Sequence, residues 1–90
     1  MKLTIHNRDV EFKFKFLSDI IFEQIQGHSF KADSEGDWII YFYSSYLANS
    51  EDYETDLETF ISYLDEDPAN FYAFIAWYTK IMTNQMKMIN

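Results

Sequence analysis

The first sixteen residues alternate between apolar and polar side chains, and this pattern constrains the fold more than any other feature of the chain. Leu3 and Ile5 alternate with polar residues before a short polar break, and an apolar residue occupies every second position from Val10 to Phe16. Because successive side chains of a strand point to opposite faces, the pattern predicts an antiparallel β-hairpin over residues 1–16 with one buried face. An isolated hairpin is only marginally stable in water, so this face must pack on the rest of the chain.

After residue 16 the spacing of the apolar residues changes to that of amphipathic helices. The first helical stripe consists of Leu17, Ile20, Ile21 and Ile25. Gly27 is a natural end for this helix, because glycine readily adopts the left-handed conformation that follows many helices. After a loop, Ser34 or Asp33 can cap a second helix, which we expect to end near residues 49–50.

Capping signals mark two further helices in the second half of the chain. Thr55 and Glu58 match the Ser/Thr-x-x-Glu capping box, which predicts the start of a third helix with one apolar face. Asp67 and Pro68 follow that helix. A carboxylate before a proline in the first turn predicts a fourth helix, which runs toward Met88.

This order of elements predicts an α+β fold in which an N-terminal antiparallel β-hairpin packs on a small bundle of about four helices. We expect one domain over residues 1–90, with the hairpin in residues 1–16 and the helical part in residues 17–90. The residues expected in the core are Leu3, Ile5, Phe12, Phe14, Leu57, Phe60, Ile61, Leu64, Phe71, Ile75 and Tyr78.

The last predicted helix carries more large apolar side chains than one narrow face can hold. Phe71, Ile75 and Tyr78 share the expected core face, whereas Trp77, Ile81 and Met88 lie on its flank. Either a small domain needs a wide stripe, or the flank binds another chain, because aromatic and methionine side chains are favoured at interfaces. The residues expected to bind a partner are Trp77, Ile81, Met88, Tyr41 and Tyr72, the two tyrosines because they project away from the apolar stripes of their helices.

The distribution of charge disfavours nucleic-acid binding. The net charge is −8, and residues 32–79 contain eleven acidic side chains and no basic one. A nucleic-acid binder needs a cationic surface that replaces the counterions of the phosphates. The N-terminus lacks the apolar core of a signal peptide, and the mostly apolar run at residues 38–48 is too short to span a bilayer. We therefore expect a soluble, cytoplasmic protein that binds neither nucleic acid nor membrane.

The sequence contains no constellation that is typical of an enzyme or a metal site. His6 and His28 are the only neutral-pH proton carriers, and the chain has no cysteine. An EF-hand loop needs glycine at its sixth position and glutamate at its twelfth, but counting from Asp52 these positions are Leu57 and Tyr63. The acids of this region are better explained as helix caps. We expect a protein with no catalytic residue, cofactor or metal.

Two sequence blocks resemble those of the small tail assembly chaperones of long-tailed bacteriophages and prophages, especially those of gut Bacteroidales. The block FEQIQGHSF, Phe22–Phe30, is similar to a Tyr/Phe-Glu-x-Ile-x-Gly-x-Ser-Phe block of that family. The block FISYLDEDP, Phe60–Pro68, is similar to a Phe-Ile-x-x-Leu-Asp-x-x-Pro block. The chain departs from the family at residues 7–9, where a glycine is commoner in the hairpin turn.

The resemblance implies a helper without enzymatic activity that works in the cytoplasm of a bacterial host. Such chaperones coat the tape-measure protein, bring tail-tube subunits to it and are absent from the finished virion. The resemblance thus implies the tape-measure and tail-tube proteins as partners. The alternative is a small structural or adaptor subunit of a homo-oligomer, such as a virion component or a regulatory protein, with no chaperone role.

Overall fold

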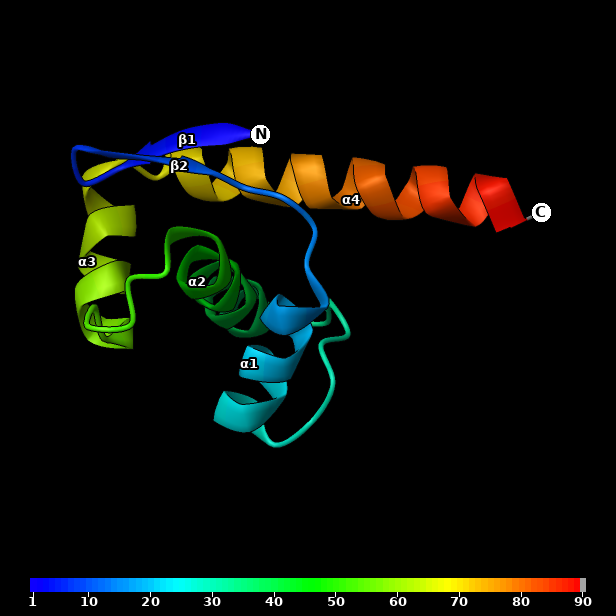
Figure 1. The fold of residues 1–90 in the computed structure, drawn as a ribbon, viewed down its shortest axis with the longest axis horizontal. Coiled ribbons are helices and arrows are strands. Elements are labelled where there is room, and N and C mark those ends of the chain that lie inside the picture. The colour runs from blue at the N-terminus through cyan, green and yellow to red at the C-terminus, as the bar shows by residue number, and fades with distance from the viewer. Residues whose placement is uncertain (90) are drawn as a thin grey trace.

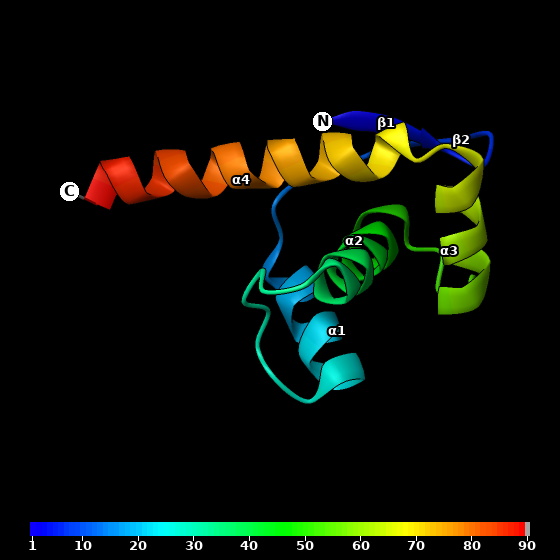
Figure 2. The same cartoon turned by 180° about the vertical axis from the view of Figure 1, so that it is seen from behind.

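The structure is a computed structural model, and it describes the backbone of residues 1–89 and the side chains of residues 1–85. A two-stranded antiparallel hairpin precedes four helices, which confirms the predicted α+β fold. The elements are β1 (Lys2–Ile5), β2 (Arg8–Glu11), α1 (Phe16–Gln26), α2 (Glu35–Ser50), α3 (Leu57–Glu66) and α4 (Ala69–Ile89). Helix α2 lies in the middle and contacts α1, α3, α4 and β2, and the hairpin lies along the first half of α4 (Figures 1 and 2).

The turn of the hairpin consists of His6 and Asn7. It therefore begins one residue earlier than the turn predicted at the polar residues 7–9. Both residues have positive φ angles, +49° and +66°, as a two-residue type I′ turn requires. Arg8 and Asp9 belong to β2, where Arg8 pairs with Ile5. Asparagine tolerates the left-handed conformation better than most residues, so this turn forms without the glycine that is common at such positions.

The strand predicted to continue to residue 16 ends at Glu11, because the next residues bind to the end of α2 instead. The backbone N–H of Lys13 donates to Asn49 Oδ1 (3.1 Å), and Asn49 Nδ2 donates to the carbonyl of Lys13 (3.2 Å). Lys15 Nζ donates to the carbonyl of Ala48 (3.1 Å). As a result Phe14 is only half-buried and Phe16 is exposed, which corrects the prediction that Phe14 lies in the core.

Local capping explains where the helices begin and end. Gly27 has a φ of +76° and ends α1, and Ser34 Oγ accepts the N–H of Asp37 (3.1 Å), so both predicted signals are confirmed. The capping box predicted at Thr55 is wrong. Asp56 caps α3 by accepting the N–H of Thr59 (2.8 Å), and the hydroxyl of Thr55 binds elsewhere.

Aromatic rings from α3, α4 and the segment after β2 meet around Phe42 of α2. Phe42 is fully buried, and its ring stacks on that of Phe74 at a centroid distance of 4.4 Å. The rings of Phe12 and Phe60 approach it at 5.4 and 5.2 Å. Of the predicted core, Ile5, Phe12, Phe60, Leu64 and Phe71 are buried, whereas Leu3, Leu57, Ile61, Ile75 and Tyr78 are half-buried. The core therefore centres on α2.

We expect Phe42→Ala to lower the free energy of unfolding by about 3–5 kcal/mol, because it removes a ring that four other rings contact. Urea denaturation measures this change. Tyr53→Ala is the matched control, since Tyr53 is exposed and its truncation should cost less than about 0.5 kcal/mol. Equal losses in the two variants would show that Phe42 is not at the centre of the core.

Candidate protein-contact surface

Most of the apolar stripe of α1 faces solvent rather than the core. The helix packs on α2 through Ser18 and Phe22, which are buried and lie one turn apart. Of the stripe predicted from the sequence, Leu17, Ile20 and Ile25 are exposed, whereas Ile21 is half-buried and packs against the core. The exposed fractions are 76% for Phe16, 42% for Leu17, 50% for Ile20 and 41% for Ile25. These four are among only six large hydrophobic residues that are exposed in the described part of the chain.

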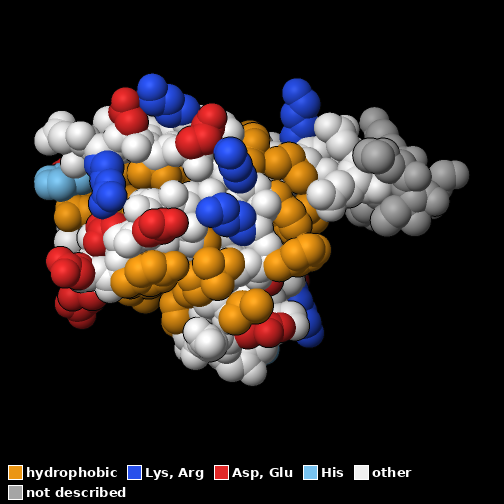
Figure 3. Space-filling model, viewed as in Figure 1, with side chains coloured by type: hydrophobic (Ala, Val, Ile, Leu, Met, Phe, Trp, Pro, Cys, Tyr) orange, Lys and Arg blue, Asp and Glu red, His pale blue; other side chains and the backbone are white. Residues whose placement is uncertain are grey.

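Phe16, Leu17 and Ile20 lie within one turn of one another and form an apolar surface together with the segment that precedes α1, whereas the helical period places Ile25 on another side of α1. The ring of Phe14 meets that of Phe16 edge-on at 5.7 Å and lies 6.4 Å from the ring of Tyr78 on α4. Figure 3 shows hydrophobic side chains gathered over α1 and beside the middle of α4. We call the set Phe14, Phe16, Leu17 and Ile20 the α1 surface. A contiguous apolar patch on a small domain is typical of a binding site.

Tyr41 is buried, which corrects the prediction that it is exposed and binds a partner. Its exposed fraction is 1%. Its hydroxyl donates to Asp19 Oδ1 of α1 (2.7 Å), and its ring stacks on Phe30 at 4.2 Å. Burial and the hydrogen bond to Asp19 raise the pKa of Tyr41, so the hydroxyl remains a donor at any physiological pH. Tyr41 thus helps to hold α1 in place and is not itself part of a contact surface.

The other predicted contact residues are spread along α4. Trp77 is half-buried, with its ring 5.8 Å from that of Phe74, and Ile81 is half-buried one turn further on. Tyr72 is exposed near the start of the helix, and the helical period places it on a different side from Trp77. The side chain of Met88 lies outside the described residues. The structure therefore does not unite these residues in one patch, and sequence reasoning missed the α1 surface because its stripe had the spacing of a core face.

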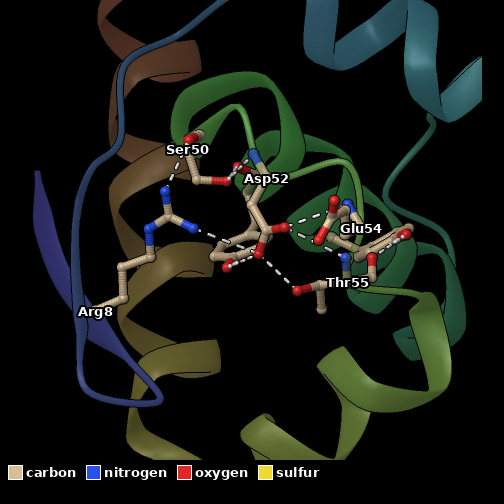
Figure 4. Close-up of polar contacts among 7 residues, drawn as sticks. Arg8, Ser50, Asp52, Glu54 and Thr55 are labelled. Carbon is tan, nitrogen blue, oxygen red and sulfur yellow. Dashed lines mark hydrogen bonds and ion pairs between the residues drawn. The ribbon is translucent and has the colours of Figure 1, made fainter.

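Asp52 is the centre of a polar cluster that joins the hairpin, the end of α2 and the start of α3 (Figure 4). Its Oδ2 accepts hydrogen bonds from the hydroxyls of Thr55 (2.6 Å) and Tyr46 (2.8 Å). Its Oδ1 accepts the backbone N–H groups of Glu54 (3.2 Å) and Thr55 (3.3 Å). The hydrogen bonds from Thr55 and then Tyr46 lower the pKa of the Asp52 carboxyl, because they favour its charged form.

Arg8 connects this cluster to the hairpin. Its guanidinium lies 3.5 Å from Asp52 Oδ2 and also donates to the carbonyl of Ser50 (3.3 Å). The carboxylate of Asp52 is thus occupied by contacts within the chain. Among the side chains of residues 1–85, no group of three potential metal ligands lies close together.

The histidines have contacts of their own at the surface. His6 stacks on Tyr63 at 4.1 Å, and its Nδ1 lies 3.2 Å from Glu66 Oε2. His28 Nδ1 lies 2.9 Å from the carbonyl of Ser29. Both side chains are exposed, as predicted, and the contacts of His6 join the hairpin turn to α3.

Among the helices that the structure describes, none is both long and apolar enough to cross a membrane.

Comparison with protein-family models finds no match for this chain, and neither do comparisons with curated proteins and with solved structures. The resemblance to tail assembly chaperones therefore rests on the two sequence blocks alone. In the structure these blocks have mainly packing roles. Phe22 and Phe60 are buried, and Gly27 ends α1.

We expect Asp52→Asn to lower the free energy of unfolding by roughly 1.5–3 kcal/mol at neutral pH, because the hydrogen bonds lose their charged acceptor. Since the folded-state pKa of Asp52 is lowered, its contribution is present above its unfolded pKa and is lost as pH falls below about 4. The difference between wild type and variant should therefore shrink below that pH. Urea titrations at several pH values test this.

The matched control for Asp52 is Glu54→Gln, which neutralises an exposed carboxyl on the same loop. Its effect on the free energy of unfolding should stay below about 0.5 kcal/mol. A loss at Asp52→Asn that does not change between pH 3 and pH 7 would contradict the assigned role of the charge.

Proposed function

We propose that the protein is a non-enzymatic protein-binding module whose contact surface is the α1 surface. The observation that carries this proposal is the orientation of α1, which packs through Ser18 and Phe22 and leaves Phe16, Leu17 and Ile20 exposed. Fully burying a side chain of this kind is worth roughly 1.5–3 kcal/mol. A partner that covers the α1 surface thus gains a driving force that the isolated domain leaves unused.

The spacing on α1 favours a helical partner. Phe16 and Ile20 lie one turn apart and Leu17 lies beside them, so their side chains form a ridge along the helix. Amphipathic helices bind such surfaces through apolar residues at positions i, i+3, i+4 and i+7. A partner with this spacing packs helix against helix over the α1 surface.

We propose further that this helical partner is a tape-measure protein, so that the chain acts as a tail assembly chaperone that also brings tail-tube subunits. The two sequence blocks that resemble the family support this proposal. A chaperone for a long helical protein needs an exposed apolar surface and enough charge to stay dissolved, and the chain has a net charge of −8. The order of the neighbouring genes tests this proposal. A tail-tube gene upstream and a very long tape-measure gene downstream favour the chaperone function.

We expect the double variant Phe16→Ala, Ile20→Ala to bind a helical fragment of that tape-measure protein at least about thirtyfold more weakly. Truncations at binding hot spots cost about 2 kcal/mol or more, which corresponds to this ratio. Because both side chains are exposed, the free energy of unfolding should change by less than about 0.5 kcal/mol for each substitution. Isothermal titration calorimetry and urea denaturation measure the two quantities.

Tyr53→Ala is the control for this experiment, because Tyr53 is equally exposed but lies on the α2–α3 connection. It should bind the fragment as wild type does. If the double variant also binds like wild type, the α1 surface is not the contact surface. If the wild-type protein does not bind any fragment of the tape-measure protein, the chaperone proposal fails.

A further inference from the structure

The protein has an apolar groove where α3, the start of α2 and the first turns of α4 meet. It consists of two adjoining hollows of about 140 and 270 Å³, which share Glu35, Phe71 and Tyr72 in their walls. The first hollow extends toward α3, where Ile61 and Leu64 line it, and the second extends between α2 and α4. We call the two hollows together the acidic groove, because every charged residue that lines them is acidic.

The acidic side chains of the groove come from two different helices and are unpaired within the described residues. Asp33 and Glu35 lie at the start of α2, and Asp65 lies in the last turn of α3. All three are exposed. Among residues 1–85, the four ion pairs involve other carboxylates, and no hydrogen bond donor contacts these three. Their negative charge is therefore available to a ligand from outside the chain.

The start of α2 does not turn the groove into a site for an anion. The free N–H groups at a helix N-terminus favour negative charge. In α2 the hydroxyl of Ser34 already accepts the N–H of Asp37 (3.1 Å), and Glu35 and Asp37 place two carboxylates in the first turn. A phosphate or carboxylate ligand would be repelled by these groups, whereas a cation would be attracted.

The walls and the size of the acidic groove suit the side chains of a protein. Each hollow is smaller than the roughly 300–1,000 Å³ of typical small-molecule pockets. Tyr72, a residue expected from the sequence to bind a partner, is 63% exposed and lines both hollows. Tyrosine is common among the residues that dominate protein interfaces. An arginine guanidinium can stack on such a ring and also bind a carboxylate.

We propose that the acidic groove binds a segment of a partner protein in which large apolar side chains are flanked by arginine or lysine residues. The apolar side chains fill the two hollows against Phe71 and Tyr72. The cationic groups bind the carboxylates of Glu35 on α2 and Asp65 on α3. Charge complementarity selects this occupant, because residues 32–79 contain eleven acidic residues and no basic one, so that an acidic segment is repelled.

This contact is separate from the one proposed for the α1 surface. No residue of α1 lines the acidic groove. The inference therefore does not depend on the helical partner of the α1 surface. A chain with both contacts can hold an apolar helix and a basic segment at the same time.

A charge-exchange experiment tests the proposal with the full chain. The probe is a synthetic peptide of leucine and arginine residues, and its matched control has glutamate in place of arginine. Isothermal titration calorimetry at physiological ionic strength measures both dissociation constants. Wild type should bind the arginine peptide at least about tenfold more tightly than the glutamate peptide. The variant Glu35→Lys, Asp65→Lys should bind the arginine peptide at least about tenfold more weakly than wild type does.

The control for this variant is Glu51→Lys, Glu54→Lys, which changes the net charge equally at exposed positions outside the groove. Its dissociation constant should stay within about threefold of the wild-type value, because screening limits the effect of distant charges. The apolar part of the contact is tested by Tyr72→Ala, which should weaken binding at least about tenfold. Tyr53→Ala is its control, since both tyrosines are exposed and only Tyr72 lines the groove.

Urea denaturation verifies that each variant is folded. The proposal is overturned if wild type does not bind the arginine peptide at up to about 1 mM, or if the two double lysine variants lose affinity equally. It is also overturned if Phe16→Ala, Ile20→Ala abolishes binding, because the peptide would then lie on the α1 surface. Self-association of wild type that Tyr72→Ala abolishes would contradict it as well, since a second copy would then occupy the groove.

Discussion

Burial of α2 on all sides is the constraint on which the rest of the structure depends. Its residues 41–48 are all buried, so in this part of the helix no side faces water. A helix that is buried all round must be covered by other elements, and its polar groups need partners within the protein. Helix α1, helix α3, helix α4 and the second strand each cover one part of α2. The hairpin, which is marginal alone, is stabilised because Phe12 reaches the ring of Phe42.

The tyrosine hydroxyls of α2 position its neighbours. Tyr41 donates to Asp19 on α1, Tyr46 donates to Asp52, and Tyr43 donates to the carbonyl of Thr55. A buried hydroxyl without a partner is costly, so these bonds select one orientation of α1 and one path for the α2–α3 connection. The orientation selected for α1 buries Ser18 and exposes Ile20. The apolar α1 surface is thus a consequence of how the core is completed.

The acidic residues fall into two groups with different surroundings. Hydrogen bonds from the hydroxyls of Thr55 and Tyr46 lower the pKa of Asp52, and hydrogen bonds from Thr59 lower the pKa of Asp56, which caps α3. Glu35 and Asp65 instead stand at the edge of an apolar groove.

The sequence by itself determined the features that depend on neighbouring residues. The order of elements, the end of α1 at Gly27 and the cap of α2 at Ser34 follow from backbone conformation and hydrogen bonds within a few residues. Even locally, Asp56 displaced the predicted Thr55 cap because Asp52 engages the Thr55 hydroxyl. Only the tertiary structure decided that Phe14 leaves the core, that Tyr41 enters it and that α1 exposes Leu17, Ile20 and Ile25. Those outcomes depend on Asn49, Phe30 and Asp19, which lie far along the chain from the residues they hold, and periodicity carries no information about such distant partners.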